Sequence, residues 1–210
     1  AIVLRCDGTT FIAGADIKAM DGMVPDEGEK FAALGQQVSS LIEEIPIPVI
    51  ACVNGFALGG GCEMAMSCDF IYATKNAVFG QPEVNLGLIP GFGGTQRLMR
   101  YVGLATSREL IYTGRNIKIE EAKDLGLVQK VFETKAEMLN HAAEVFSTIR
   151  SKSALIISKC KEVIREGESL SIENGLKIEK AAFKYVFGTA DKAEGIKAFL
   201  EKRPAAFKNK

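Results

Sequence analysis

Two glutamates stand in segments whose neighbours could make them acid–base catalysts. Glu63 lies in ALGGGCEMAMSCD (57–69), just after three consecutive glycines. Glu83 lies in FGQPEVNLGLIPGFGGTQR (79–97), after Pro82 and among apolar and glycine residues, which predicts partial desolvation and a raised pKa. Two carboxyl groups near one water could divide the removal and the delivery of a proton. The alternatives are a first-turn glutamate that interacts with a helix dipole and an exposed loop glutamate.

The glycine-rich segments could also supply backbone donors for a negative oxygen. The glycines at 59–61 predict a loop that feeds a helix, whose first N–H groups are unpaired and allow close approach of a ligand. In FIAGADIK (11–18), Asp16 could begin a short helix, and the Ala15 N–H could be a second donor. The alternatives are a turn needed only for tight packing and an ordinary strand–helix connection. GFGGT (91–95) does not match a dinucleotide-binding loop, and there is no phosphate-binding loop of the Walker type.

The elements that must position these residues follow from hydrophobic spacing and from glycine and proline breaks. Buried strands are expected at 1–6, 48–53 and 69–74, and a further strand at 127–132. Helices are expected at 26–45, 94–103, 106–114 and 119–126. From about Thr134 to Phe199 the pattern is helix after helix, with breaks near Arg150, Gly167 and Gly188. This order predicts an α/β core followed by a helical appendage.

Composition excludes several classes of function. The 210 residues hold 26 basic and 26 acidic side chains, and this absence of net charge argues against a nucleic-acid binder. His141 is the only histidine and no C-x-x-C pair occurs, so we expect no metal site and no Ser-His-Asp hydrolase. The five cysteines read as reduced, mostly buried thiols. No stretch is apolar for the ~20 residues that a membrane span needs.

Three motifs together resemble the crotonase (enoyl-CoA hydratase/isomerase) superfamily. They are IAGADIK, NGFALGGGCEMAMSCD and FGQPEVNLGLIPGFGGTQRL, and the resemblance extends through AFLEKRPAAFKNK at the end of the chain. It implies an α/β fold in which residues 1–133 form a superhelix (spiral) of ββα units with the active site. Residues 134–210 would form a C-terminal helical trimerisation region. Family members carry some tens of residues before the strand that matches 1–6, so we expect an N-terminal section of the fold to be missing from this sequence.

The resemblance also implies roles for particular residues. The oxyanion hole for the thioester carbonyl would be formed by the N–H groups of Ala15 and Gly60. Glu63 would activate water and Glu83 would protonate C2, while Gly91 would line the acyl group. The CoA moiety would run along residues of the first motif, namely Ala13, Ala15, Asp16, Ile17 and Lys18. It would also approach two residues near the C-terminus of a neighbouring subunit, Phe199 and Lys202. The last two are expected to share one face of a helix, because they are three residues apart.

The implied function is that of an enoyl-CoA hydratase, a lyase of fatty-acid β-oxidation or butyrate-type metabolism. It would convert short-to-medium 2-trans-enoyl-CoA to 3-hydroxyacyl-CoA, reversibly, as in 3-hydroxybutyryl-CoA dehydration. We expect no cofactor beyond the coenzyme A of the substrate, a homotrimer or dimer of trimers, no nucleic-acid or membrane partner, and a cytoplasmic or mitochondrial-matrix location. The alternatives are an enoyl-CoA isomerase and a non-catalytic CoA-thioester or RNA-binding protein. Glutamate at both positions 63 and 83 favours the hydratase, although the fold alone does not decide between these activities.

Overall fold

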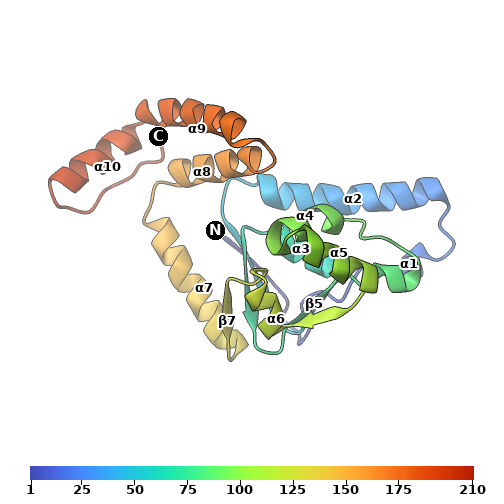
Figure 1. Ribbon diagram of the computed structural model, residues 1–210. Coiled ribbons are helices and arrows are strands. Elements are labelled where there is room, and N and C mark those ends of the chain that lie inside the picture. Colours follow the sequence, from blue (N-terminus) through green and yellow to red (C-terminus); the bar gives the residue numbers. More distant parts are fainter. The chain divides into compact units, whose positions relative to one another are not determined.

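The computed structural model describes residues 1–210, and the chain divides into two compact units. The core unit contains residues 2–43 and 49–142, and the C-terminal unit contains residues 1, 44–48 and 143–210. All of the strands belong to the core unit, and the regular structure of the C-terminal unit is helical (Figure 1). None of the helices combines the length and apolar character that a membrane span requires.

A four-stranded parallel sheet forms the centre of the core unit. Its strand order is β1 (Ile2–Arg5), β2 (Val49–Val53), β4 (Phe70–Thr74) and β7 (Lys130–Phe132). Every residue of β2 is buried, because this strand pairs with β1 on one side and β4 on the other. The prediction of a buried strand at 1–6 was wrong in one respect. β1 is an edge strand that pairs only with β2, so its residues are half-buried or exposed.

The second and third motifs contribute strands to a smaller sheet, which the sequence did not predict. Its three strands are β3 (Phe56–Leu58), β5 (Val78–Gly80) and β6 (Asn116–Lys118), with β5 parallel to β3 and antiparallel to β6. Each strand has only three residues, too few to show a period of two in the sequence. A single parallel bridge between Ile12 and Ala57 attaches the segment of the first motif to this sheet.

The helices of the core unit agree closely with the expected ranges. They are α1 (Ile17–Met20), α2 (Pro25–Glu44), α3 (Gly60–Met66), α4 (Gly94–Val102), α5 (Leu104–Thr113), α6 (Ile119–Asp124) and the first half of α7 (Lys135–Arg150). α2 begins with proline and two acidic residues, which suit a helix N-terminus. The strand expected at 127–132 begins only at Lys130, because the amides of Leu127 and Val128 close the turn after α6 by donating to the Ala122 carbonyl.

One lysine joins the beginning of the core unit to its end. The Nζ of Lys135, at the start of α7, donates to the carbonyl oxygens of Cys6 at 2.5 Å, Asp7 at 2.9 Å and Gly8 at 3.4 Å. These carbonyls follow the last residue of β1 and have no strand on which to pair. Lys135 therefore satisfies the carbonyls of Cys6 and Asp7 just after the edge strand, and it shares the Gly8 carbonyl with Asn54 Nδ2, which donates to it at 2.9 Å.

The C-terminal unit contains the end of α7, then α8 (Ala154–Gly167), α9 (Ile172–Phe187) and α10 (Ala190–Leu200). The side-chain oxygens of Ser153, Ser171 and Thr189 cap α8, α9 and α10 by accepting from backbone amides. The predicted breaks near Arg150, Gly167 and Gly188 are thus confirmed.

Candidate active site

The turn at Gly59–Gly61 places the start of α3 against the segment of the first motif. Gly59 has φ +51° and ψ −124°, a backbone conformation that favours glycine. A Cβ at Gly61 would lie 2.0 Å from the carbonyl oxygen of Ile12, so only glycine allows the two backbones to approach this closely. A Cβ at Gly60 would lie 3.8 Å from the nitrogen of Ala15. The two residues expected to form the oxyanion hole are therefore neighbours in space.

The amides of Ala15 and Gly60 are both unused within the chain. Gly60 is the first residue of α3, and neither N–H donates a hydrogen bond to a protein group. Gly14, with φ +127°, turns the chain just before Ala15. Asp16 then caps α1 by accepting from the amides of Lys18 at 3.0 Å and Ala19 at 3.4 Å, which confirms the predicted helix start. Beside half-buried Ala15, the side chains of Ala13, Asp16, Ile17 and Lys18 are exposed.

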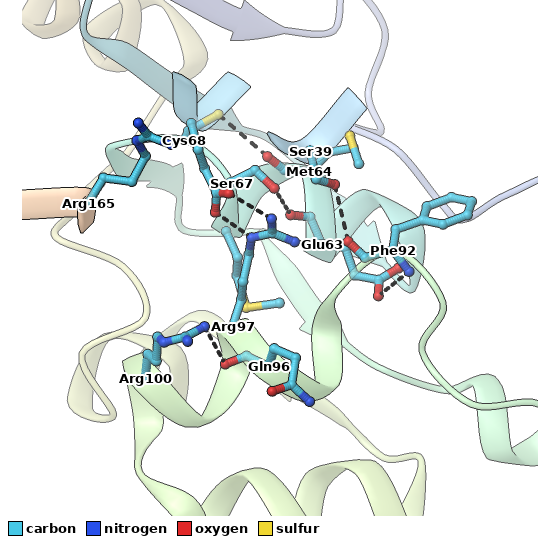
Figure 2. Close-up of polar contacts among 12 residues, drawn as sticks. Ser39, Glu63, Met64, Ser67, Cys68, Phe92, Gln96, Arg97, Arg100 and Arg165 are labelled. Carbon is cyan, nitrogen blue, oxygen red and sulfur yellow. Dashed lines mark hydrogen bonds and ion pairs between the residues drawn. The ribbon is translucent and has the colours of Figure 1, made fainter. Parts of the chain in front are cut away.

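Glu63 is buried in the first turn of α3, with 1% of its surface exposed. Its Oε1 accepts from the amide of Phe92 at 2.9 Å and from that of Gly94 at 2.6 Å (Figure 2). Both hydrogen bonds use Oε1, which leaves Oε2 as the oxygen that could accept from a water. Burial raises the pKa of Glu63, and the two amides and the charge of Arg97 oppose that rise. These donors favour the ionised form.

Glu83 has a different environment. It begins the short 3₁₀ helix η1 (Glu83–Leu86), and its Oε2 is buried without a hydrogen-bond partner. A Cβ at Gly59 would lie 2.8 Å from its Oε1, so the carboxyl group reaches the turn that leads into α3. Burial raises the pKa of Glu83 to about 7, and the nearby charge of Glu63 adds to the rise. The desolvation expected from the sequence is confirmed, and the reading of an exposed loop glutamate is wrong.

The loop at 91–94 connects these groups to α2 and α4. Besides the two amides that hold Glu63, the loop has its own supports. The carbonyl oxygen of Phe92 accepts from Ser39 Oγ at 3.1 Å and from Arg97 Nη1 at 2.9 Å (Figure 2). Arg97 also binds both carboxylate oxygens of Glu43, at 2.5 and 2.8 Å. Gly91, the residue expected to line the acyl group, lies half-buried in this loop, and its carbonyl oxygen accepts from Gln36 Nε2 at 2.9 Å.

Sequence reasoning missed most of this support. It singled out GFGGT only to reject a dinucleotide-binding loop, although two amides of that segment hold Glu63. A buried carboxylate needs hydrogen-bond donors, but the two amides that donate to Glu63 lie about thirty positions further along the chain. Nothing in the sequence indicated Ser39 or the pair of Glu43 and Arg97.

Phe199 and Lys202 belong to the C-terminal unit, whereas the residues of this cluster belong to the core unit. The prediction that they share a helix face was wrong. α10 ends at Leu200, and Lys202 lies beyond it in a left-handed conformation with φ +52°. Phe199 remains on the helix with 82% of its surface exposed. No group of three or more histidine, cysteine, aspartate or glutamate residues in the chain could hold a metal ion.

The chain is similar to known proteins over its whole length. A family model described as enoyl-CoA hydratase/isomerase matches residues 1–210. The short-chain-enoyl-CoA hydratase of Clostridium acetobutylicum is 48% identical over 212 residues, which cover 100% of this chain and 81% of the relative. The crotonyl-CoA hydratase of Syntrophomonas wolfei is 49% identical over 209 residues, which cover 100% and 80%. The solved structure of enoyl-CoA hydratase from Bacillus anthracis has a TM-score of 0.93 at 39% identity, covering 100% of this chain and 81% of that one. These similarities confirm the crotonase-like α/β fold.

Proposed function

This chain belongs to the enoyl-CoA hydratase/isomerase family, and we propose that it adds water across the C2=C3 bond of short-to-medium 2-trans-enoyl-CoA. The product is the 3-hydroxyacyl-CoA, which makes the protein a lyase. The observation that carries this proposal is the contrast between the carboxyl groups of Glu63 and Glu83. Oε1 of Glu63 accepts from two amides, whereas Oε2 of Glu83 is buried without a partner.

The first step is stabilisation of charge on the thioester. Attack of water at C3 moves an electron pair to the carbonyl oxygen, which becomes an enolate oxygen. The unused N–H groups of Ala15 and Gly60 form the oxyanion hole that accepts this oxygen. Each such donor is worth roughly 3–4 kcal/mol in the transition state. The exposed residues beside Ala15 form the path of the CoA moiety.

The second step is the division of proton transfers. Burial raises the pKa of Glu63, but the Phe92 and Gly94 amides favour its ionised form, which takes the proton of the attacking water. Glu83, with its pKa near 7, is protonated in about half of the molecules at neutral pH, and this protonated form delivers the proton to C2. Opposite environments of two neighbouring carboxyl groups are the usual basis for opposite acid and base roles. Because these groups supply every proton and every charge contact, the reaction needs no cofactor.

The assembly and location are further parts of the proposal. The region 134–210 is the oligomerisation region of a homotrimer or dimer of trimers. Exposed large apolar side chains on α9 and α10 support this role: Ile172, Leu176, Phe183, Tyr185, Phe187, Ile196, Phe199 and Leu200. The location is the cytoplasm, as bacterial relatives favour. The mitochondrial matrix is the alternative, because relatives from Dictyostelium discoideum and Pongo abelii carry names that state it.

Hydration of crotonyl-CoA tests the function directly. The absorbance of the conjugated thioester falls as water adds, and 3-hydroxybutyryl-CoA is identified by mass. We expect turnover by the wild type and by Glu120→Gln, a matched change at an exposed glutamate of α6. We expect at least ~10²-fold slower turnover by Glu63→Gln. If the wild type moves the double bond of 3-enoyl-CoA but does not hydrate crotonyl-CoA, the protein is an isomerase instead.

A further inference from the structure

The C-terminal tail, residues 203–210, runs back beside α10 after a reversal of the chain (Figure 1). The reversal occurs at Lys202, whose backbone has φ +52°. Glycine or asparagine usually takes this left-handed conformation, so a lysine there needs support from its surroundings. Phe207 of the tail packs on the helix, because a Cβ at Gly195 would lie 3.3 Å from its ring. Two acidic residues of α10 supply further support.

Asp191, in the first turn of α10, holds the end of the tail. Its side chain is buried, and its Oδ1 accepts from the amide of Lys208 at 2.7 Å. Its Oδ2 accepts from the amide of Asn209 at 2.9 Å and from the hydroxyl of Ser153 at 2.5 Å. Burial tends to raise the pKa of Asp191, but these donors outweigh burial and hold that pKa below its usual value. An acid in a first turn usually serves only the helix dipole, whereas both oxygens of Asp191 have specific partners.

Glu194 holds the beginning of the tail and lies on the same face of α10 as Asp191, since the two are three residues apart. Its carboxylate oxygens accept from Arg203 at 2.7 and 3.0 Å, and Oε1 also accepts from the amide of Ala206 at 2.8 Å. The Arg203 contact is the main cause that lowers the pKa of Glu194 to about 2. The residue that directly follows Lys202 is therefore tied to the helix, while the exposed ammonium of Lys202 has no partner within the chain.

We propose that Asp191 is a positioning residue, which holds the tail so that the reversal at Lys202 presents its ammonium to a phosphate of CoA bound to a neighbouring subunit. This inference rests on the proposed function and on the CoA contact that the resemblance implies for Lys202. The contacts of Asp191 and Glu194 fix the backbone on both sides of the tail and do not use the Lys202 side chain. The ammonium thus starts from a fixed point and is free to bind an anion, and phosphate is a strong partner for it.

The experiment compares kcat/KM for crotonyl-CoA with kcat/KM for crotonyl-pantetheine, a thioester that lacks the phosphates of CoA. Their ratio is independent of the fraction of enzyme that is folded, and a general weakening of the site lowers both values alike. Asp191→Asn places an NH₂ group against donors, so we expect the ratio to fall roughly 10-fold through a higher KM for crotonyl-CoA, with kcat unchanged. This factor is about the value of one charge-assisted hydrogen bond.

Glu194→Gln should give a smaller fall of the ratio, and it serves where Asp191→Asn folds poorly. A ratio within about twofold of the wild type in both variants overturns the inference. Asp124→Asn is the matched control, a change at an exposed aspartate of α6 that should leave the ratio unchanged. A fall in this control as large as that in Asp191→Asn also overturns the inference.

A double-mutant cycle with Lys202→Ala tests whether Asp191 acts through Lys202. Lys202→Ala alone should lower the ratio roughly 10-fold, and Asp191→Asn in the same chain should lower it little further, because the group that it positions is already gone. Effects that multiply, or a Lys202→Ala variant with the ratio of the wild type, overturn the inference. A wild type that hydrates neither thioester overturns the proposed function and this inference with it, whereas an unchanged ratio overturns the inference alone.

Discussion

Replacing Glu83 with glutamine should make the protein less active and more stable. The pKa of Glu83 is raised from the ordinary value of 4.5 to about 7, chiefly by burial. In the folded chain the carboxyl group therefore ionises at higher pH than in the unfolded chain, and folding is penalised once the unfolded chain ionises. At about 1.4 kcal/mol for each pKa unit, the full penalty is about 3 kcal/mol. It is absent below pH 4.5, grows between 4.5 and about 7, and is complete above 7.

Glu83→Gln removes this penalty while keeping the size and shape of the side chain. We expect the variant to gain about 2–3 kcal/mol in free energy of unfolding at pH 8 relative to the wild type, and close to nothing at pH 4. Turnover of crotonyl-CoA should fall at least ~10²-fold, because the donor of the C2 proton is gone. Urea unfolding at the two pH values and the hydration assay measure both effects. An equal stability difference at both pH values would refute the argument from burial, and near-wild-type turnover would refute the acid role.

The remaining predictions concern the groups around Glu83. In the wild type, hydration should slow as the pH rises through about 7, since Glu83 then loses the proton it must donate; a flat profile across this range would contradict its role. Glu63→Gln should shift this decline to lower pH, because the charge of Glu63 raises the pKa of Glu83; the pH profile of its residual activity measures the shift. Gly60→Val should leave the fold intact and reduce CoA-thioester binding and turnover, since the branched side chain would begin 3.8 Å from the nitrogen of Ala15, beside the amide that is proposed to bind the thioester oxygen. Equal losses of thermal stability and turnover would show that this glycine serves only the turn. Arg97→Lys should lower kcat roughly 10-fold with little change in KM, because lysine cannot replace the two-pronged contact with Glu43 while also holding the Phe92 carbonyl. A change confined to KM would argue against this positioning role.

The sequence predicted the helices and strands whose limits depend on neighbouring residues. The helix from Pro25 shows apolar spacing and stops before Pro46, and Asp16 is a side chain suited to capping. The run VIACV predicts a strand buried on both faces, which β2 is. The glycines at 59–61 likewise predicted a helix N-terminus with unused amides just before Glu63.

The failures concern properties set by distant parts of the chain. β1 has the composition of a buried strand, yet its exposure depends on which strands flank it. The helix that carries Phe199 ends at Leu200 without a glycine, and only Pro204 further along hints at the end. The donors to Glu63 are backbone amides, which no residue type identifies. The pair of Glu43 and Arg97 joins α2 to α4 across 54 positions of the sequence. In a sequence these two residues look the same as ordinary surface charges.

The contact of Lys135 with the end of β1 has a consequence for how the protein acquires its structure during synthesis. β1 is synthesised before the other strands of its sheet, but the lysine that binds the carbonyls just after β1 and the strand β7 that covers the open edge of β4 come much later. At ordinary elongation rates, roughly several seconds separate the synthesis of Thr74 from that of Lys130. During that time β4 presents an unpaired apolar edge of the kind that recruits strands from other chains. Folding dominated by such distant parallel pairings is slow, on the order of milliseconds to seconds. Chaperone dependence of the nascent chain should therefore end when the segment around residues 130–135 has emerged.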